Sequence, residues 1–361
     1  MLQNDPNVAA ELASKGFSII DVPELAQECR TLNAELQGLF NQDAETLKQF
    51  QLFQLGIERG YFPSKSQHPR FSKDPVNGST KAALDESKEY WYGKRRINPF
   101  PSDCLSVAAA YASAYSYYER LADAIIYNIA EWLGAVGGGA KDNWLDLFSN
   151  KHISRSDQSH ALVALHYPGY FPDPDLAELW LRSDEHCDNS VFSIVPLSAA
   201  DDLEVQIGGQ WISLNRSPVS TQNSVVVMVG NILHLLMKGC APDDAESVFP
   251  PVPHRVRGNS AVRWCDARFN SAFFVTLPDE ISLIDLATKS PLSIPDLRRS
   301  ANVEHDPIPS TGLGLAYMVQ KPIWRSGITF REFADLRVSY SDHIKHALRH
   351  VDYFLDERYA R

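Results

Sequence analysis

Short strand-like runs dominate residues 182–275, and they constrain the fold more than any other feature of this sequence. The runs are rich in hydrophobic and β-branched residues and are separated by turn-forming residues: Val191–Pro196, Leu203–Ile207, Trp211–Leu214 and Ser224–Met237. Many short strands with turns between them are typical of a double-sheet jelly roll. Such a barrel has an open mouth, where ligand sites are favoured.

Two residues with metal-binding side chains stand near the start of this stretch. His186 and Asp188 are two positions apart, and residues with that spacing on a strand point to the same face. His254 precedes a later apolar run, so it completes a face of three ligands if that run is a neighbouring strand. Two imidazoles and one carboxylate with open positions form the facial triad of non-haem Fe(II) oxygenases. Taken alone, His-x-Asp is a frequent pair, and a surface loop is its simplest alternative.

The order of motifs around these residues resembles the catalytic core of the isopenicillin N synthase-like, 2-oxoglutarate-dependent Fe(II) dioxygenases. The matching segments follow the family's order: His186-Cys187-Asp188, Leu203-Glu204-Val205-Gln206, Trp211, Gly230-Asn231, His254-Arg255-Val256 and Arg268-Phe269-Asn270-Ser271-Ala272-Phe273-Phe274. The resemblance is good over residues 161–275 and weaker over most of the remaining chain.

Three features depart from the family's pattern. Asn270 replaces the serine of the family's Arg-x-Ser, and Leu165 replaces an asparagine ahead of the metal pair. Residues 239–253 form a longer segment than is usual in the family, which predicts an added loop beside the site. The first two changes leave the geometry of co-substrate binding open.

The resemblance implies an iron site and its co-substrates. His186, Asp188 and His254 are expected to hold Fe(II), with 2-oxoglutarate and O2 as co-substrates. The expected reaction is hydroxylation, desaturation or ring closure of a small specialised-metabolism substrate, with release of succinate and CO2. Two alternatives remain: an Fe(II) oxidase of the isopenicillin N synthase type that needs no 2-oxoglutarate, and a non-catalytic metal-binding sensor.

The same resemblance assigns residues to 2-oxoglutarate. Arg268 is expected to pair with the distal carboxylate, because a planar guanidinium suits a carboxylate bidentately. Tyr167, together with Asn270 or Ser271, is expected to help bind it. Arg263 competes for the role of Arg268, because the segment before Arg268 has the composition of a lengthened hairpin.

His166 and Cys187 are further candidate metal ligands. His166 precedes Tyr167 on the expected strand Ala161–Tyr167, so strand alternation places it on the opposite face. Cys187 lies between two presumed ligands and is expected to point away from the metal for the same reason. We therefore expect a small core residue at Cys187 and no metal contact from His166.

A rival metal site is present near the end of the sequence. His343, His346 and His350 share one face of an expected helix within Asp342–Arg361 and could bind zinc. This group lacks the glutamate of His-Glu-x-x-His and a visible fourth ligand. A half-exposed basic helical face explains the three histidines more simply.

The segments around the core predict helices and one loop. Apolar spacing near 3.6 residues predicts helices at Asn7–Ala13, within Pro23–Gly56 and from Ser102 to about Val136. Thr329–Glu332 fits a capping box that begins a later helix. The turn-rich segment Phe62–Lys81 predicts a loop.

These elements predict a mainly β fold with flanking helices (α+β) around a double-stranded β-helix, or jelly-roll, core. Residues 1–150 are expected to form an N-terminal helical and strand region that packs on the barrel. Residues 151–280 are expected to form the jelly-roll core. Residues 281–361 are expected to form an extension with C-terminal helices that could act as a lid.

Composition excludes several classes of partner and compartment. The formal net charge of −11 disfavours binding to the phosphates of nucleic acid. Five cysteines without a Cys-x-x-Cys pair argue against a disulfide framework. The first residues lack a secretory signal, and no apolar run is long enough to span a bilayer. We expect a cytoplasmic protein with a small-molecule substrate and no membrane partner, and the oligomeric state is left open.

Overall fold

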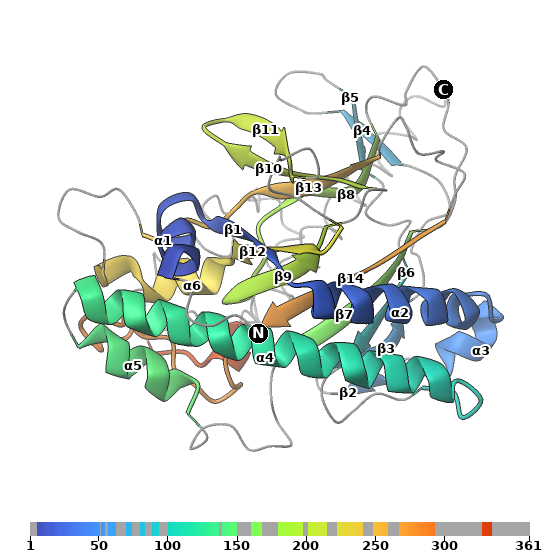
Figure 1. Cartoon of the computed structure of the whole chain (residues 1–361), viewed down its shortest axis with the longest axis horizontal. Coiled ribbons are helices and arrows are strands. Elements are labelled where there is room, and N and C mark those ends of the chain that lie inside the picture. Colours follow the sequence, from blue (N-terminus) through green and yellow to red (C-terminus); the bar gives the residue numbers. More distant parts are fainter. Residues whose placement is uncertain are drawn as a thin grey trace, which may run out of the picture.

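Two β-sheets face each other, and a layer of helices covers the outer face of the larger sheet (Figure 1). The computed structural model describes these residues of the chain: 6–50, 52–54, 57–62, 70–73, 80–83, 89–93, 100–136, 139–149, 160–167, 180–197, 201–214, 222–240, 248–258, 267–292 and 327–333. Within these ranges, every helix is too short or too polar to cross a membrane.

The larger sheet has eight strands in the order β1-β12-β9-β14-β7-β6-β3-β2. Its core strands pair antiparallel, with Arg268 opposite Tyr167 in the β14–β7 pair. In sequence order, its strands are β1 (Phe17–Asp21), β2 (Leu52–Gln54), β3 (Ile57–Phe62), β6 (Glu89–Gly93), β7 (Ala161–Tyr167), β9 (Phe192–Pro196), β12 (Ser224–Val229) and β14 (Arg268–Val275).

The smaller sheet has six strands in the order β11-β10-β13-β8-β5-β4. Its strands are β4 (Arg70–Lys73), β5 (Thr80–Ala83), β8 (Trp180–His186), β10 (Asp201–Ile207), β11 (Gln210–Ser213) and β13 (His254–Gly258). The antiparallel pairing of β13 with β8 places His254 opposite His186. The two histidines of the predicted triad are therefore neighbours across one strand pair.

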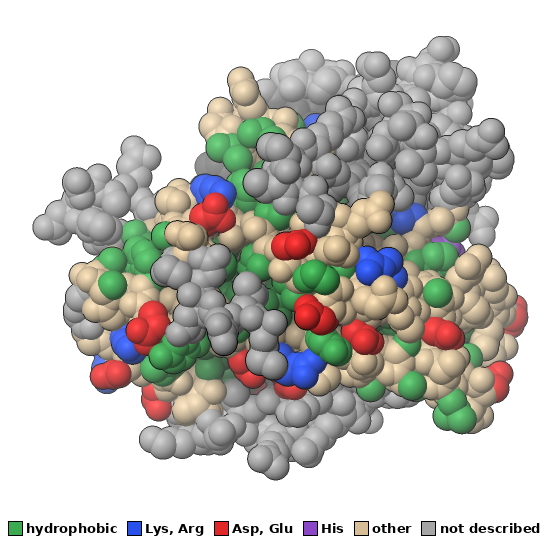
Figure 2. All heavy atoms as spheres, viewed as in Figure 1, with side chains coloured by type: hydrophobic (Ala, Val, Ile, Leu, Met, Phe, Trp, Pro, Cys, Tyr) green, Lys and Arg blue, Asp and Glu red, His purple; other side chains and the backbone are tan. Residues whose placement is uncertain are grey.

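The helical layer lies on the larger sheet. Its helices are α1 (Pro6–Lys15), α2 (Pro23–Phe40), α3 (Ala44–Lys48), α4 (Leu105–Val136), α5 (Ala140–Leu147) and α6 (Asn231–Leu236). Pro23 at the first turn of α2 suits a helix start, because proline needs no backbone donor there. Figure 2 shows the outer face of this layer, where acidic and basic side chains are scattered among other side chains. The opposite faces of α2 and α4 are apolar and pack on the sheet.

A separate hydrophobic cluster fills the space between the sheets. It joins Val226 and Met228 of β12 to Leu203 and Val205 of β10, together with Val256 of β13. Alternate residues of β12 belong instead to the cluster under the helices. The inner face of each strand is thereby identified, and His254, which is opposite Val205 and two positions from Val256, lies on it.

Several predictions are confirmed. The mainly β architecture with flanking helices agrees with the expected jelly-roll core, and β7 has the predicted bounds. In the capping box, the Glu332 amide donates to Oγ1 of Thr329 at 3.2 Å, and the Thr329 amide donates to Oε2 of Glu332 at 2.8 Å. The three domain ranges stay a prediction.

Three expected segments are wrong in part. The run Ser224–Met237 is a strand only as far as Val229, and α6 follows, because a fully buried run carries no alternation that separates strand from helix. The region Pro23–Gly56, which was expected to be helical, contains α2 and α3, but residues 52–54 form the strand β2. The expected loop Phe62–Lys81 contains β4, which pairs with β5 in the smaller sheet.

Two of the alternative sites fall outside the described residues. They are Arg263, and the group formed by His343, His346 and His350. The helix predicted within residues 342–361 also lies outside these ranges.

Candidate metal centre

His186, Asp188 and His254 lie together at one end of the smaller sheet. His186 is the last residue of β8, and His254 is the first residue of β13. One potential ligand atom from each of the three side chains lies within 4.8 Å of the others. Among the described residues, this is the group of histidine, cysteine and acidic side chains that could hold a metal ion.

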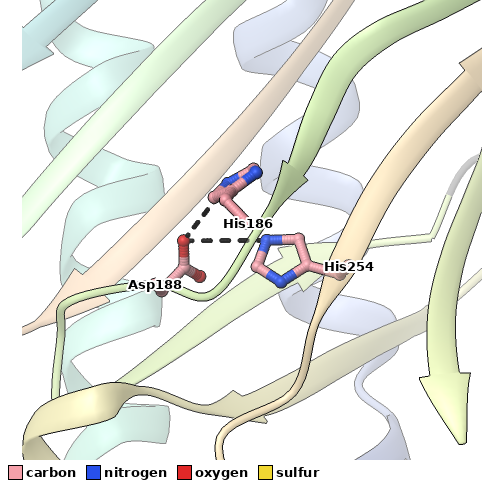
Figure 3. Close-up of side chains that lie close together, drawn as sticks. All are labelled: His186, Asp188 and His254. Atoms are coloured by element: carbon pink, nitrogen blue, oxygen red, sulfur yellow. Dashed lines mark ion pairs between the residues drawn. The ribbon is translucent and has the colours of Figure 1, made fainter. Parts of the chain in front are cut away.

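The three side chains point toward one another (Figure 3). Oδ1 of Asp188 lies 3.6 Å from Nε2 of His186 and 3.6 Å from Nε2 of His254. The two imidazole rings have centroids 4.4 Å apart. The side chain of His186 is 44% exposed, whereas Asp188 and His254 are each 8% exposed, so one side of the group is open to solvent.

The backbone orients His254. Nδ1 of His254 lies 3.0 Å from the carbonyl oxygen of Val252 and donates to it in the tautomer that leaves Nε2 as an acceptor. Such a second hydrogen bond fixes the tautomer of a metal-binding histidine. Sequence reasoning missed Val252, although its position between Pro251 and Pro253, which restrict the backbone, is a usable signal.

The structure corrects how Asp188 reaches the site. We expected His186 and Asp188 to share the face of one strand, but β8 ends at His186, and Asp188 lies two residues beyond it, directly before a bend at residues 189–191. The carboxylate therefore reaches the two imidazoles from just beyond the end of the strand.

Arg268 and Tyr167 face each other across the β14–β7 pair of the larger sheet. Both are buried, with 7% and 4% exposed, and the guanidinium carbon of Arg268 lies 4.7 Å from the centroid of the Tyr167 ring. A guanidinium over an aromatic face is held by a cation–π interaction. The predicted pair of co-substrate residues is thus assembled in one place, and its role stays a proposal.

Asn270 and Ser271 lie on opposite faces of β14. Asn270 is two positions from Arg268, so it shares the face of Arg268 and is buried. The hydroxyl of Ser271 is instead 2.9 Å from the hydroxyl of Tyr118 on α4, beneath the helical layer. This placement corrects the expectation that Ser271 helps to bind 2-oxoglutarate, because its side chain is directed to the far side of the sheet.

His166 lies away from the triad, as alternation predicted, whereas Cys187 follows the end of β8 and is half-buried. The ring of His166 stacks on Phe269 with centroids 4.7 Å apart and contacts Phe40 of α2, so it lies on the helical side. Burial, followed by the charges of Asp188 and Glu185, raises the pKa of the Cys187 thiol to about 11. Cys187 is therefore a neutral thiol at neutral pH.

A polar cluster behind His254 was not anticipated from the sequence. Nε of Arg255 donates to Oε2 of Glu204 at 2.7 Å, and the Arg255 guanidinium carbon lies 4.1 Å from the centroid of the Trp211 ring. These residues alternate with Val205 and His254, so they lie on the outer face of the smaller sheet. They tie β13 to β10 and β11 directly beside the histidine.

The chemistry of the donor set fits a divalent transition metal. Two imidazole nitrogens and one carboxylate oxygen are the ligands of the facial triad that non-haem Fe(II) uses. A carboxylate between two histidines supplies one negative charge to balance the cation. The exposed side at His186 leaves room for further ligands.

Comparisons with known proteins agree with this geometry. Residues 158–277, which contain the triad, Arg268 and Tyr167, match the model of the 2OG-Fe(II) oxygenase superfamily. A curated relative, 2'-deoxymugineic-acid 2'-dioxygenase of Hordeum vulgare, is 31% identical over 119 residues, which is 33% of this chain. The match spans only 29% of that relative's length.

Solved structures share the fold over a larger part of the chain. A Caulobacter crescentus protein described as belonging to the 2OG-Fe(II) oxygenase family aligns with a TM-score of 0.60 and 19% identity, covering 92% of both chains. A Neurospora crassa protein, solved in complex with alpha-KG (2-oxoglutarate), aligns with a TM-score of 0.54 and 18% identity, covering 78% of this chain and 81% of the Neurospora chain. At these identities the likeness shows the fold.

Proposed function

We propose that this chain, a member of the 2OG-Fe(II) oxygenase superfamily over residues 158–277, is an Fe(II)- and 2-oxoglutarate-dependent oxygenase that acts on a small molecule. One observation carries the proposal: His186, Asp188 and His254 bring two imidazoles and one carboxylate within 4.8 Å of one another inside that matched segment. Three protein ligands leave positions for a chelating co-substrate and for O2.

The three residues of the triad would have different roles at the metal. Bound Fe(II) would supply the activation of O2 and the oxidation of the substrate. His186 and His254 would bind the metal through neutral nitrogens, and Asp188 would cancel one of its two positive charges. The bond from Nδ1 of His254 to the Val252 carbonyl keeps Nε2 available as a ligand.

Arg268 and Tyr167 would bind the distal carboxylate of 2-oxoglutarate. A buried guanidinium stabilises a carboxylate far more than an exposed one does, because water does not screen the pair. The Tyr167 ring holds the guanidinium in place at 4.7 Å. Asn270, on the same face of β14, adds an amide where the resembling family has a serine hydroxyl.

The substrate we propose is a small specialised metabolite, and the outcome is hydroxylation, desaturation or ring closure with release of succinate and CO2. The barley relative acts on a small molecule by its name, which supports this class. An Fe(II) oxidase that needs no 2-oxoglutarate is the second candidate. Asn270 and Leu165, which replace family residues beside the co-substrate site, favour it.

The experiment is an anaerobic titration of the Fe(II)-loaded protein with 2-oxoglutarate, followed by the weak visible band of a chelated ketoacid. We expect the band to appear and saturate. Arg268→Ala should weaken 2-oxoglutarate binding roughly 10- to 100-fold, because a hydrogen bond to a charged group contributes about 1.5–3 kcal/mol.

Arg120→Ala is the matched control. Arg120 also lies over a tyrosine ring, at 4.1 Å from Tyr117, but on the exposed side of α4. It should leave the titration unchanged. Iron binding without a band would replace the proposal with the oxidase, and iron binding without O2 uptake under any co-substrate would replace it with a sensor.

A further inference from the structure

We propose that Gly230 and Asn231 are positioning residues that hold Asp188 in place for the metal. The inference rests on the proposed function only in requiring that the triad binds a divalent metal. It concerns the turn between β12 and α6, which none of the sequence patterns assigned to the metal. We call residues 188–191 the ligand bend.

Backbone hydrogen bonds join the start of α6 to the ligand bend. The amide of Asn231 donates to the carbonyl oxygen of Asp188 itself at 2.8 Å. The amide of Ile232 donates to the carbonyl of Ser190 at 3.2 Å, and the amide of Gly230 donates to the carbonyl of Val191 at 3.0 Å. Three consecutive amides therefore bind the bend that carries the carboxylate.

The side chain of Asn231 adds a fourth bond. Its Nδ2 donates to Oδ1 of Asn189 at 3.0 Å, and Asn189 is the residue directly after Asp188. Both groups are neutral, so the bond places no second carboxylate beside Asp188. Asn231 stands where the resembling family has an aspartate.

Gly230 is required by space and not by its backbone angles. Its φ of −95° and ψ of 168° are extended values that any residue adopts. A Cβ at this position would lie 2.1 Å from the carbonyl oxygen of Ser190 and 2.8 Å from the carbonyl carbon. Any side chain would therefore push against the backbone of the ligand bend.

Asp188 is the member of the triad that needs this support. His186 and His254 are opposite each other in the β8–β13 pair, whereas Asp188 lies beyond the end of β8. All six residues of β12 are buried, so the turn that follows this strand begins in the core of the molecule. The position of the Asp188 carboxylate thus depends on contacts with residues 230–232.

The test measures Co(II) binding to the metal-free full chain by the visible absorption of bound Co(II). Gly230→Ala should weaken Co(II) binding roughly 10- to 100-fold, the range seen when outer-shell partners of metal ligands are lost. Asn231→Ala should weaken it by a smaller factor. Asn231→Asp should restore binding close to that of the wild type, because the Asn189 amide can rotate and donate to a carboxylate.

Gly38→Ala is the matched control, since a Cβ at Gly38 on α2 meets nothing within 4 Å. Circular dichroism melts show whether each variant is folded, and Asn231→Ala keeps the test decisive if Gly230→Ala does not fold. If the wild type binds Co(II) and both Gly230→Ala and Asn231→Ala bind it equally well, this inference alone is overturned. A wild type that binds no Co(II) overturns the proposed function as well.

Discussion

Two clusters of three polar side chains differ in how their donors and acceptors are matched: the metal triad at the smaller sheet, and a group between the helices α2 and α4 and the strand β14. In the triad, Oδ1 of Asp188 stands 3.6 Å from each histidine Nε2, which is beyond the length of a good hydrogen bond. Beneath the helices, the Tyr118 hydroxyl lies 3.2 Å from the Cys29 sulfur and 2.9 Å from the Ser271 hydroxyl. We call this second group the buried trio.

The difference lies in donors and acceptors. Tyr118 and Ser271 each carry a hydroxyl that can donate and accept, so the buried trio satisfies itself without solvent or a ligand. The triad presents atoms that bind a cation, on a side that is open to solvent at His186. A polar cluster that completes its own hydrogen bonds stabilises the fold, whereas one that gathers ligand atoms is suited to bind a metal.

Of the changes that distinguish the two clusters, removal of the Asp188 carboxylate should have the largest effect on metal binding. Asp188→Ala should weaken Co(II) binding by more than about 100-fold, because the site loses its one negative charge and a ligand. The circular dichroism spectrum should match that of the wild type, since the triad does not support the core. Co(II) affinity equal to that of the wild type would remove Asp188 from the metal centre.

A change in the buried trio should instead lower the free energy of unfolding and leave metal binding intact. Tyr118→Phe should lower the free energy of unfolding by about 1–3 kcal/mol, because it leaves buried polar atoms of Cys29 and Ser271 without the phenol. Co(II) binding should be unchanged. Chemical denaturation measures the first quantity, and Tyr117→Phe, at a half-buried neighbour on α4, is the control.

Alkaline pH should reduce the stability that the buried trio contributes to the fold. Burial raises the pKa of Cys29 from 9.0 to about 11, and burial also raises the pKa of Tyr118. The folded state holds these protons more tightly than the unfolded state does, so the stability they contribute is fully present below pH 9 and falls as the pH rises through about 11.

Denaturation midpoints between pH 8 and 11 check this expectation, and Cys29→Ala should flatten the decline. Burial also raises the pKa of Cys240 to about 11, so part of the slope should persist in that variant. A slope that is identical in Cys29→Ala and the wild type would contradict the assignment.

The smallest effect should come from a local cap that touches neither cluster. Thr329→Ala removes the side-chain acceptor of the Glu332 amide and should cost about 1 kcal/mol of unfolding free energy. Thr329→Ser should retain most of it, since serine caps as well as threonine does. A loss of Co(II) binding in Thr329→Ala would show that the two regions are coupled.

The sequence was informative where the signal is local. The bounds of β7, the capping box at Thr329 and the spacing of His186 and Asp188 all depend on residues close together in the chain. It was less informative where tertiary contacts decide. The apolar run after Ser224 reads alike as strand and helix, and only the structure shows that Gly230 ends the strand against Ser190.

The buried trio illustrates the same limit. Cys29 and Ser271 are 242 positions apart, and nothing in their local sequence relates them. The sequence therefore predicted that Ser271 contacts the co-substrate, whereas the fold directs its hydroxyl to Tyr118. The sequence also grouped Asp188 with His186 and His254, and its position beyond the end of β8 required the fold.

Because the three ligands are unequally exposed, the metal centre has a solvent-exposed side and a buried side. His254 and Asp188 are 8% exposed, and His186 is 44% exposed. A chelator in solution would reach the metal beside His186 first, and the His186 imidazole would dissociate from the metal before the other two ligands do. We expect bound metal to exchange quickly with the medium even where its equilibrium affinity is high, so that occupancy follows the metal supply around the protein.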